Sequence, residues 1–560
     1  MKRCIELPNL AEPTREHGRI YHECERNTED GSPPAARLTT HRPGGLGGCC
    51  GPRLSACAPS NSQTSSAGNV LTVAASAAIT TWDPVRSFST EALYLGNVYE
   101  PLLWKNPAGA DTEFTPAIAT AWESSADGLT WTFTIRQGAT FHDGEPVDAA
   151  AVKASIEAAQ KDGGASFIWA PLASIEAPDA TTVVMNLSYA APMDIIAASG
   201  NGAWIVSPKA LAALASDETY FDAGIDAGSG PYTVASYTPG SEVVLTRYKE
   251  HWNTEATPGF DTVDISITAD AVTAQQMLTA GEVDFATNIP LENAASLADT
   301  EDFTVRDFNS PFNYLAMFNT TRPPLDDPKV RQALSEAIPY DDIIDVGGQG
   351  YGSQSHGPVP KGIFPYSDSV PMYSQDLDKA ASMLAEAGHP GGGFELNLSY
   401  ASENPSEARF VPLIKDAFAK IGVTVNVTAE LFNQQWATAK ADPATAQDIF
   451  VLYYWPSYSD AGADNLFSLF HSSDEPFFNL SYWKNDKYDA LVTEAGTQSG
   501  TDRDAAQASY QQAMQILYDE APAAFLYDAR SVSVVPKGLN VGQFNENYPF
   551  TVFFAPISHD

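Results

Sequence analysis

Cysteine is absent from most of this 560-residue sequence. The five cysteines all lie at or before residue 57, and none follows up to residue 560. A disulfide framework, a cysteine-ligated metal or a catalytic thiol would need cysteines inside the folded part of the chain. Everything that looks foldable begins near Val70, so these roles are excluded there, and Cys57 must serve something other than the fold.

Basic residues are also scarce, with 31 Lys and Arg against 70 Asp and Glu. Residues 1–57 take 8 of the basic and 7 of the acidic residues, which leaves 23 and 63 for the rest, a formal charge of about −40. Nucleic acids and anionic lipid surfaces attract clustered Lys and Arg. We therefore expect no nucleic-acid partner and no direct adhesion to anionic lipid. The acidic excess indicates either a solubilising surface or a cleft that attracts cations.

Long apolar runs are missing too. No stretch of 18 or more apolar residues occurs, so no transmembrane helix is predicted. Residues 1–56 are rich in Pro, Gly, Arg and Thr without apolar periodicity, and we expect this leader to be disordered or removed. The remainder has hydrophobic runs and frequent aromatic residues. Its length exceeds what a single core supports, so two or more lobes are expected.

Local patterns that are present predict helices alternating with strands. Asp327 can cap a helix over "PLDDPKVRQALSEAI", and Pro328 suits its first turn. Asp376 opens and Gly388 stops a second helix, "DLDKAASMLAEAG". The strand "FELNLSYA", the helix "EARFVPLIKDAFAKIG" and the strand "VTVNV" then follow in succession. This order indicates a sheet with crossover helices, and hence an α/β fold.

A second sheet-rich region is predicted over residues 70–270. The segment "LTWTFTIR" alternates with period two, and "TTVVMNL" has the composition of another strand. The segment "GPYTVASYTPGSEVVLTRY" predicts a hairpin that turns at Pro239 and Gly240. The chain is therefore expected to contain two α/β regions.

Motifs of known catalytic and metal sites are absent from the sequence. It has no G-x-S-x-G nucleophile elbow, no HExxH and no Walker loop. Two carboxylates across a cleft could hydrolyse a glycoside, but 63 acidic residues would supply suitable pairs by chance. The nine His include no close pair in the foldable part. We expect neither an enzyme nor a bound metal or cofactor, with a hydrolase as the least favoured alternative.

Three stretches, taken together, resemble one family. They are "AIATAWESSADGLTWTFTIRQGATFHDGEPVDAAAVKASI", "GSGPYTVASYTPGSEVVLTRYKEHW" and "FNTTRPPLDDPKVRQALSEAI". In this order and spacing, the chain from about Val70 onward is similar to the family 5 extracellular solute-binding proteins. This is the peptide and nickel class that serves ATP-binding-cassette importers.

The resemblance implies a type II periplasmic-binding-protein-like clamshell of the large peptide-binding class. Residues 69–309 with 532–560 are expected to form lobe I and residues 310–531 lobe II. Two crossovers are expected near Asn309–Phe312 and Ala529–Ser533. Such a protein, expected to be a monomer, captures a small solute such as an oligopeptide between its lobes and delivers it to a membrane permease. A solute sensor or adhesin that uses the same clamshell without transport is the alternative.

The resemblance also gives Cys57 a role. Leu54-Ser55-Ala56-Cys57 resembles a lipobox, in which the cysteine is diacylated and becomes the first residue of the mature protein. Two acyl chains are needed, because each buried methylene contributes about 0.8 kcal/mol and a single chain holds only reversibly. Residues 57–68 then form a flexible tether on the outer face of the cell membrane, with the lipid as the only membrane contact. No apolar stretch precedes this lipobox, so we expect the assigned start or the upstream reading frame to be wrong.

The segment "VLYYWPSYSDAGADNLFSLF" resembles the cleft-lining stretch of the family, in which a Trp is followed by an acidic residue that can hold a ligand's amino group. Trp455 and Asp460 fit these roles, with Asp464 as the competing carboxylate. Tyr458 could supply a flat wall or belong to the core. The remaining candidates are a loop that resembles one touching the ligand backbone and a strand residue beside the first crossover: Ser87, Phe88, Ser89, Thr90 and Tyr314.

One departure from the family bears on the solute. Relatives specific for dipeptides place an Arg, which receives the peptide carboxylate, just before the stretch that matches "NPSEAR". This chain has Ala401, Ser402 and Glu403 there. A fixed dipeptide fit is therefore not expected. Longer peptides held through their backbones and non-peptide solutes, including a metal chelate, remain open.

Overall fold

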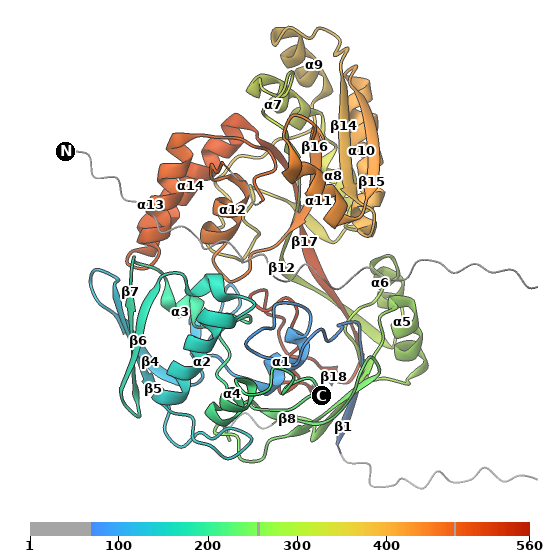
Figure 1. Ribbon diagram of the computed structural model, residues 1–560. Helices are drawn as coiled ribbons and strands as arrows, with labels where there is room; N and C mark the ends of the chain where they lie inside the picture. Colours follow the sequence, from blue (N-terminus) through green and yellow to red (C-terminus); the bar gives the residue numbers. More distant parts are fainter. Residues whose placement is uncertain (1–68, 255–257, 475–477) are drawn as a thin grey trace, which may run out of the picture. The chain divides into compact units, whose positions relative to one another are not determined.

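The computed structural model describes residues 69–254, 258–474 and 478–560 (Figure 1). The expected leader, the tether and the lipidation at Cys57 all fall before residue 69 and so lie outside the described residues. Within the described part, no helix is both long enough and apolar enough to cross a membrane.

Five strands form the first sheet, in the spatial order β11, β1, β10, β9, β8. β1 is parallel to β10 and β11, whereas β9 pairs antiparallel with β10 and β8. The predicted hairpin is confirmed as β8–β9, and Gly240 in its turn has a φ of 68°, which glycine adopts without strain. The strands are β1 (Val70–Ala75), β8 (Tyr232–Thr238), β9 (Glu242–Arg247), β10 (Thr262–Ile267) and β11 (Phe285–Ala286).

Four antiparallel strands form the second sheet, in the order β4, β5, β7, β6. The two segments predicted as strands are confirmed as β5 and β7, whose side chains Phe133, Val183 and Met185 are fully buried. Helix α2 packs on β6 and β7 and begins after Asp148, whose carboxylate accepts a hydrogen bond from Ala151 N. The elements are β4 (Ala119–Ser124), β5 (Thr130–Ile135), β6 (Leu172–Asp179), β7 (Thr182–Leu187) and α2 (Ala149–Asp162).

Six strands form the third sheet, in the order β13, β17, β12, β16, β14, β15 (Figure 1). The predicted strand–helix–strand unit is confirmed as β14–α10–β15, with the two strands parallel. Both predicted helix caps are also confirmed, at Asp327 for α7 and at Asp376 for α9. The elements are β12 (Phe303–Phe318), β13 (Gly352–Gln354), β14 (Glu395–Ala401), β15 (Thr424–Glu430), β16 (Ile449–Tyr454), β17 (Ala523–Pro536), α7 (Pro328–Ala337), α9 (Leu377–Glu386) and α10 (Pro405–Lys420).

Two long strands, β12 and β17, lead from the third sheet to the region of the first. They pair antiparallel, and their register shifts between Asn309, which faces Arg530, and Asn313, which faces Asp528. Beyond this irregularity, Val535 at the end of β17 packs in the core of the first sheet. The chain after Val535 remains in this core, to which Leu539, Phe554 and Ile557 also belong. The C-terminal residues therefore complete the core of the N-terminal part.

The remaining helices and strands complete the described fold. They are α1 (Ala92–Val98), α3 (Met193–Ile196), α4 (Pro208–Leu214), α5 (Ala271–Ala280), α6 (Leu291–Ala298), α8 (Tyr340–Gly347), α11 (Phe432–Ala441), α12 (Phe467–Phe470), α13 (Asp486–Gln498), α14 (Arg503–Glu520), β2 (Leu103–Lys105), β3 (Phe114–Pro116), β18 (Leu539–Asn540) and β19 (Ser558–His559). A 3₁₀ helix covers Ser166–Trp169, and one π-helical turn covers Gly462–Leu466.

The first turn of α10 buries a carboxyl group, that of Glu407, which is 1% exposed. Its oxygens accept hydrogen bonds from Ala401 N at 2.8 Å and from Asn404 Nδ2 at 3.1 Å. Burial outweighs these bonds and raises the pKa of Glu407 to about 8. The folded protein therefore holds this proton to a much higher pH than the unfolded chain does.

We expect Glu407→Gln to flatten the pH dependence of stability. The proton on Glu407 stabilises the folded state fully below the unfolded pKa of 4.5, and this contribution is lost as the pH rises through about 8. The free energy of unfolding should fall by up to about 1.4 kcal/mol per pH unit in the native chain, and less in the variant. Urea unfolding at pH 5, 6.5 and 8 measures this, with the exposed Glu218→Gln as the control. If the free energy of unfolding changes equally with pH in Glu407→Gln and in the native chain, the carboxyl of Glu407 is ionised in the folded protein.

Candidate functional site

A small cavity of about 30 Å³ is lined by segments that lie far apart in the described part of the sequence. Residues 455–459, which follow β16 of the third sheet, form one side. Ala92 at the start of α1 and residues 199–201 come from the N-terminal part, and residues 546–551 come from the C-terminal segment. The volume holds only one or two water-sized groups. A solute can enter here only if these walls move apart.

A second cavity, of about 790 Å³, lies beside one face of α1. Trp104, Trp252 and Phe308 contribute apolar surface to its lining, and Glu100 and Asn97 contribute polar groups. Its volume falls within the usual range for sites that bind small molecules. Residues 548–551 line this cavity and the small one, so the C-terminal segment is a wall common to both.

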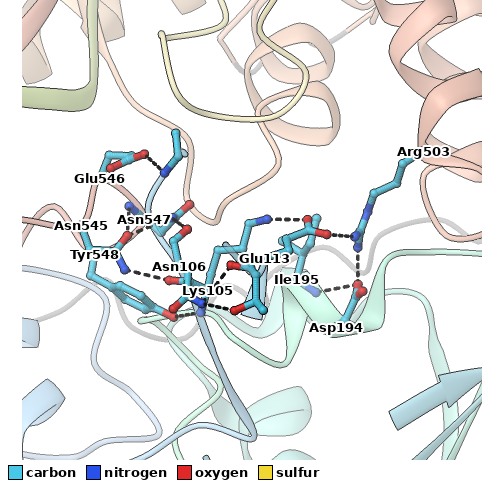
Figure 2. Close-up of polar contacts among 12 residues, drawn as sticks. Lys105, Asn106, Glu113, Asp194, Ile195, Arg503, Asn545, Glu546, Asn547 and Tyr548 are labelled. Carbon is cyan, nitrogen blue, oxygen red and sulfur yellow. Dashed lines mark hydrogen bonds and ion pairs between the residues drawn. The ribbon is translucent and has the colours of Figure 1, made fainter. Parts of the chain in front are cut away.

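The C-terminal segment is held to the loop after β2 by hydrogen bonds (Figure 2). Asn545 Nδ2 donates to Lys105 O at 2.7 Å, and Lys105 N donates to Tyr548 Oη at 2.8 Å. Asn547 Nδ2 likewise donates to Asn106 O at 2.9 Å. The sequence prediction missed this segment. Its run "FNENYPF" signals a loop, but nothing local identifies a partner more than 400 residues away.

Trp455 and Tyr458, both predicted to meet the solute, line the small cavity. Trp455 is 37% exposed, and its ring lies 5.7 Å from Phe312, 5.4 Å from Tyr453 and 5.9 Å from Phe550, centroid to centroid. Such a cluster offers a flat apolar surface. Tyr458 is half-buried, and burial raises the pKa of its hydroxyl.

Asp460 directly follows the residues that line the small cavity and is itself fully buried. Its Oδ1 accepts hydrogen bonds from Gly462 N at 2.9 Å and Ala463 N at 3.1 Å, which fix the turn into the π-helical residues. Its Oδ2 has no hydrogen-bond partner among the described residues. Burial raises the pKa of the carboxyl to about 6. A buried carboxylate oxygen without a donor is uncommon and is suited to receive one from a ligand.

Asp464, the competing carboxylate, is bound differently. It accepts hydrogen bonds from Tyr454 Oη at 3.0 Å, Ser457 N at 2.5 Å and Ser468 Oγ at 3.3 Å. Burial raises its pKa as well. Because both of its oxygens are already used, Asp464 holds the loop in place and has less capacity for a ligand than Asp460 has.

The predicted loop of residues 87–90 lies before α1 and does not line the small cavity. Ser87 is fully buried, and its Oγ has no partner among the described residues. Phe88 is 43% exposed, and Ser89 is exposed. Thr90 donates a hydrogen bond to Ala78 O at 2.9 Å and lines the larger cavity. The structure thus places Trp455 and Tyr458 on the small cavity, which none of these four residues lines.

Tyr314 packs inside the core of the third sheet. It is 6% exposed, its ring stacks on Tyr527 at 4.7 Å, and Phe410 approaches it edge-on at 5.7 Å. It lines neither cavity.

No group of three or more His, Cys, Asp or Glu in the described residues is arranged to hold a metal ion.

Residues 113–477 match the family described as bacterial extracellular solute-binding proteins, family 5. The chain belongs to this family, whose members serve ATP-binding-cassette importers. It is 30% identical to the glutathione-binding protein GsiB of Pectobacterium atrosepticum over 436 residues, which cover 77% of this chain and 83% of that protein. It is 29% identical to GsiB of Escherichia coli K12 over 480 residues, or 83% and 90% of the two chains.

Solved structures show the same fold. HbpA2 of Haemophilus parasuis superposes with a TM-score of 0.76 at 24% identity, covering 88% of this chain and all of that one. DppA of Helicobacter pylori, solved in complex with the peptide STSA, gives 0.70 at 23% identity and covers 88% and 98% of the two chains. The predicted α/β fold of a type II periplasmic binding protein is therefore confirmed.

Proposed function

We propose that this chain captures a peptide-like solute that carries a free amino group and delivers it to an ATP-binding-cassette permease. The observation that carries the proposal is the unpartnered Oδ2 of Asp460, next to a cavity lined by Trp455 and Tyr458. An ammonium group that leaves water needs a charged acceptor, and a buried carboxylate supplies one. Glutathione, a tripeptide with one ammonium group, is the first probe to test, because relatives of this chain are named as binding it.

The solute is proposed to lie between two lobes with the boundaries expected from the sequence. Residues 69–309 with 532–560 contain the first and second sheets, and residues 310–531 contain most of the third. The register shift after Asn309 falls at the first expected crossover. Closure of the lobes would bury the solute, and the closed form would be read by the permease. We further propose that the protein acts as a monomer anchored outside the cell by lipidated Cys57.

Solute binding should stabilise the folded protein. At about a hundredfold excess over its dissociation constant, a ligand that binds only the folded state adds about 2.7 kcal/mol to the free energy of unfolding. We expect such a shift in urea unfolding with glutathione or with tri- to pentapeptides that carry a free amino group. Glucose serves as the control and should leave the midpoint unchanged. If none of the peptide probes moves the midpoint, the solute is not peptide-like.

A further inference from the structure

The two proposed lobes touch at a turn between α13 and α14. At Gly500, an added Cβ would lie 2.5 Å from the backbone N of Ala191, in the N-terminal part. On the facing side, a Cβ at Gly128 would lie 2.5 Å from Thr501 Cγ2. Separations below 3.0 Å are essentially never seen for real Cβ atoms, so the backbones of Gly500 and Ala191 approach this closely only because residue 500 is a glycine, whereas the close atom at Gly128 belongs to a side chain.

An ion-pair network lies beside this contact (Figure 2). Arg503 Nη2 lies 2.5 Å from Asp194 Oδ1, and Arg503 Nη1 lies 2.9 Å from Glu113 Oε2. Lys105 Nζ pairs with the other oxygen of Glu113 at 2.5 Å. The side chain of Arg503 is 26% exposed and that of Asp194 is 9% exposed. Such partly buried, charge-assisted bonds are stronger than exposed ion pairs.

The position of Arg503 in α14 also indicates that this residue serves the contact between the proposed lobes. It is the first residue of α14, where Asp502 caps the helix by accepting a hydrogen bond from Ala505 N. A positive charge at this end is unfavourable, because the helix dipole is positive there. The guanidinium group is instead neutralised by Asp194 and Glu113, which belong to the other proposed lobe. The arginine therefore contributes to the contact between the proposed lobes.

We propose that the turn at Gly500 and the Arg503 ion pairs form a latch that holds the two lobes in their closed arrangement. Opening the cleft would separate Gly500 from Ala191 and would break both ion pairs of Arg503. Arg503 is then a positioning residue, because it sets the fraction of molecules that are closed without touching the solute. The proposal rests on the proposed two-lobed binding function and identifies what controls closure at that site.

Distances between the lobes test the latch directly, by pulsed electron paramagnetic resonance and without any solute. Spin labels are attached at Lys161→Cys on α2 and Lys415→Cys on α10, two exposed positions, after the five native cysteines are changed to serine. Arg503→Gln and Gly500→Ala should each raise the ratio of long to short distances by about tenfold or more. Unchanged distance distributions in both variants would overturn the latch.

Matched controls separate the latch from general damage to the fold. Gly496→Ala adds a Cβ inside α13, where the nearest atom is Tyr510 Oη at 3.7 Å, and it should leave the distances unchanged. Asp194→Asn should open the lobes as Arg503→Gln does, and the double variant should open them no further. Additive effects in the double variant would contradict a direct pairing of Arg503 with Asp194. Because no solute is present, this experiment tests the latch independently of the proposed solute binding.

Discussion

Replacing Asp460 with Asn is expected to weaken the binding of peptides that carry a free amino group by about 2–5 kcal/mol. The substitution preserves the shape of the side chain, and its remaining oxygen can still accept the bonds from Gly462 N and Ala463 N. The substitution removes the negative charge of the carboxylate, whose Oδ2 has no hydrogen-bond partner among the described residues. The buried ammonium group of the solute would then face a neutral acceptor, which compensates only partly for the lost water.

Two comparisons make this result specific. Peptides with an acetylated N-terminus should lose far less affinity in Asp460→Asn, because they bring no ammonium group. Asp464→Asn should lower the stability of the fold, since Asp464 accepts three hydrogen bonds, but should bind free-amino peptides almost normally. Titration calorimetry on both variants decides between the carboxylates. A loss confined to Asp464→Asn would move the role to Asp464, and no loss in either would mean that the solute is not held by its amine.

The protonation of Asp460 adds a pH signature to the same prediction. Because burial raises the pKa of Asp460 to about 6, the carboxyl is mostly ionised at pH 7 and mostly protonated at pH 5. The affinity of the native chain for free-amino peptides should therefore fall as the pH is lowered from 7 to 5. In Asp460→Asn this dependence should largely disappear, and an undiminished dependence would assign it to another group.

The second large effect concerns Cys57 and the membrane. When the protein is exported with a working signal, Cys57→Ser should move it from the membrane fraction to the soluble fraction. The described residues contain no helix that could cross a membrane, and two acyl chains on Cys57 would supply the anchor. Cys50→Ser is the matched control and should leave the protein with the membrane. Cell fractionation followed by immunoblotting measures this, and membrane partition that survives Cys57→Ser would refute the lipid anchor.

The helix caps and the hairpin turn could be predicted, because each depends on residues only a few positions apart in the sequence. Asp327 and Asp376 cap helices through backbone groups two or three residues away, and Pro239 with Gly240 marks the hairpin turn within its own segment. The surroundings of Tyr314 could not be predicted in the same way, because its strand is central in the third sheet and has core residues on both faces. The alternation of side chains along such a strand does not identify which face meets a solute.

Two features could not be predicted from the sequence: which of the two carboxylates keeps an oxygen without a hydrogen-bond partner, and which residues form ion pairs between the proposed lobes. The sequence placed Asp460 and Asp464 four residues apart with equal chemistry, and only the fold distinguishes them, through the three donors that occupy Asp464. The contact between Arg503 and Asp194 joins residues more than 300 positions apart, and no periodic pattern signals it. Pairings of this kind become visible only when the strands and helices have been assembled.

Native mass spectrometry tests the central claim, the capture of one peptide-like solute, most directly. Gently purified protein, incubated with glutathione and with a panel of free-amino peptides, should show one added solute per chain. The increment should disappear on denaturation and should be recovered as the intact solute. Absence of a complex with every member of the panel, or recovery of a hydrolysed product, would contradict the account.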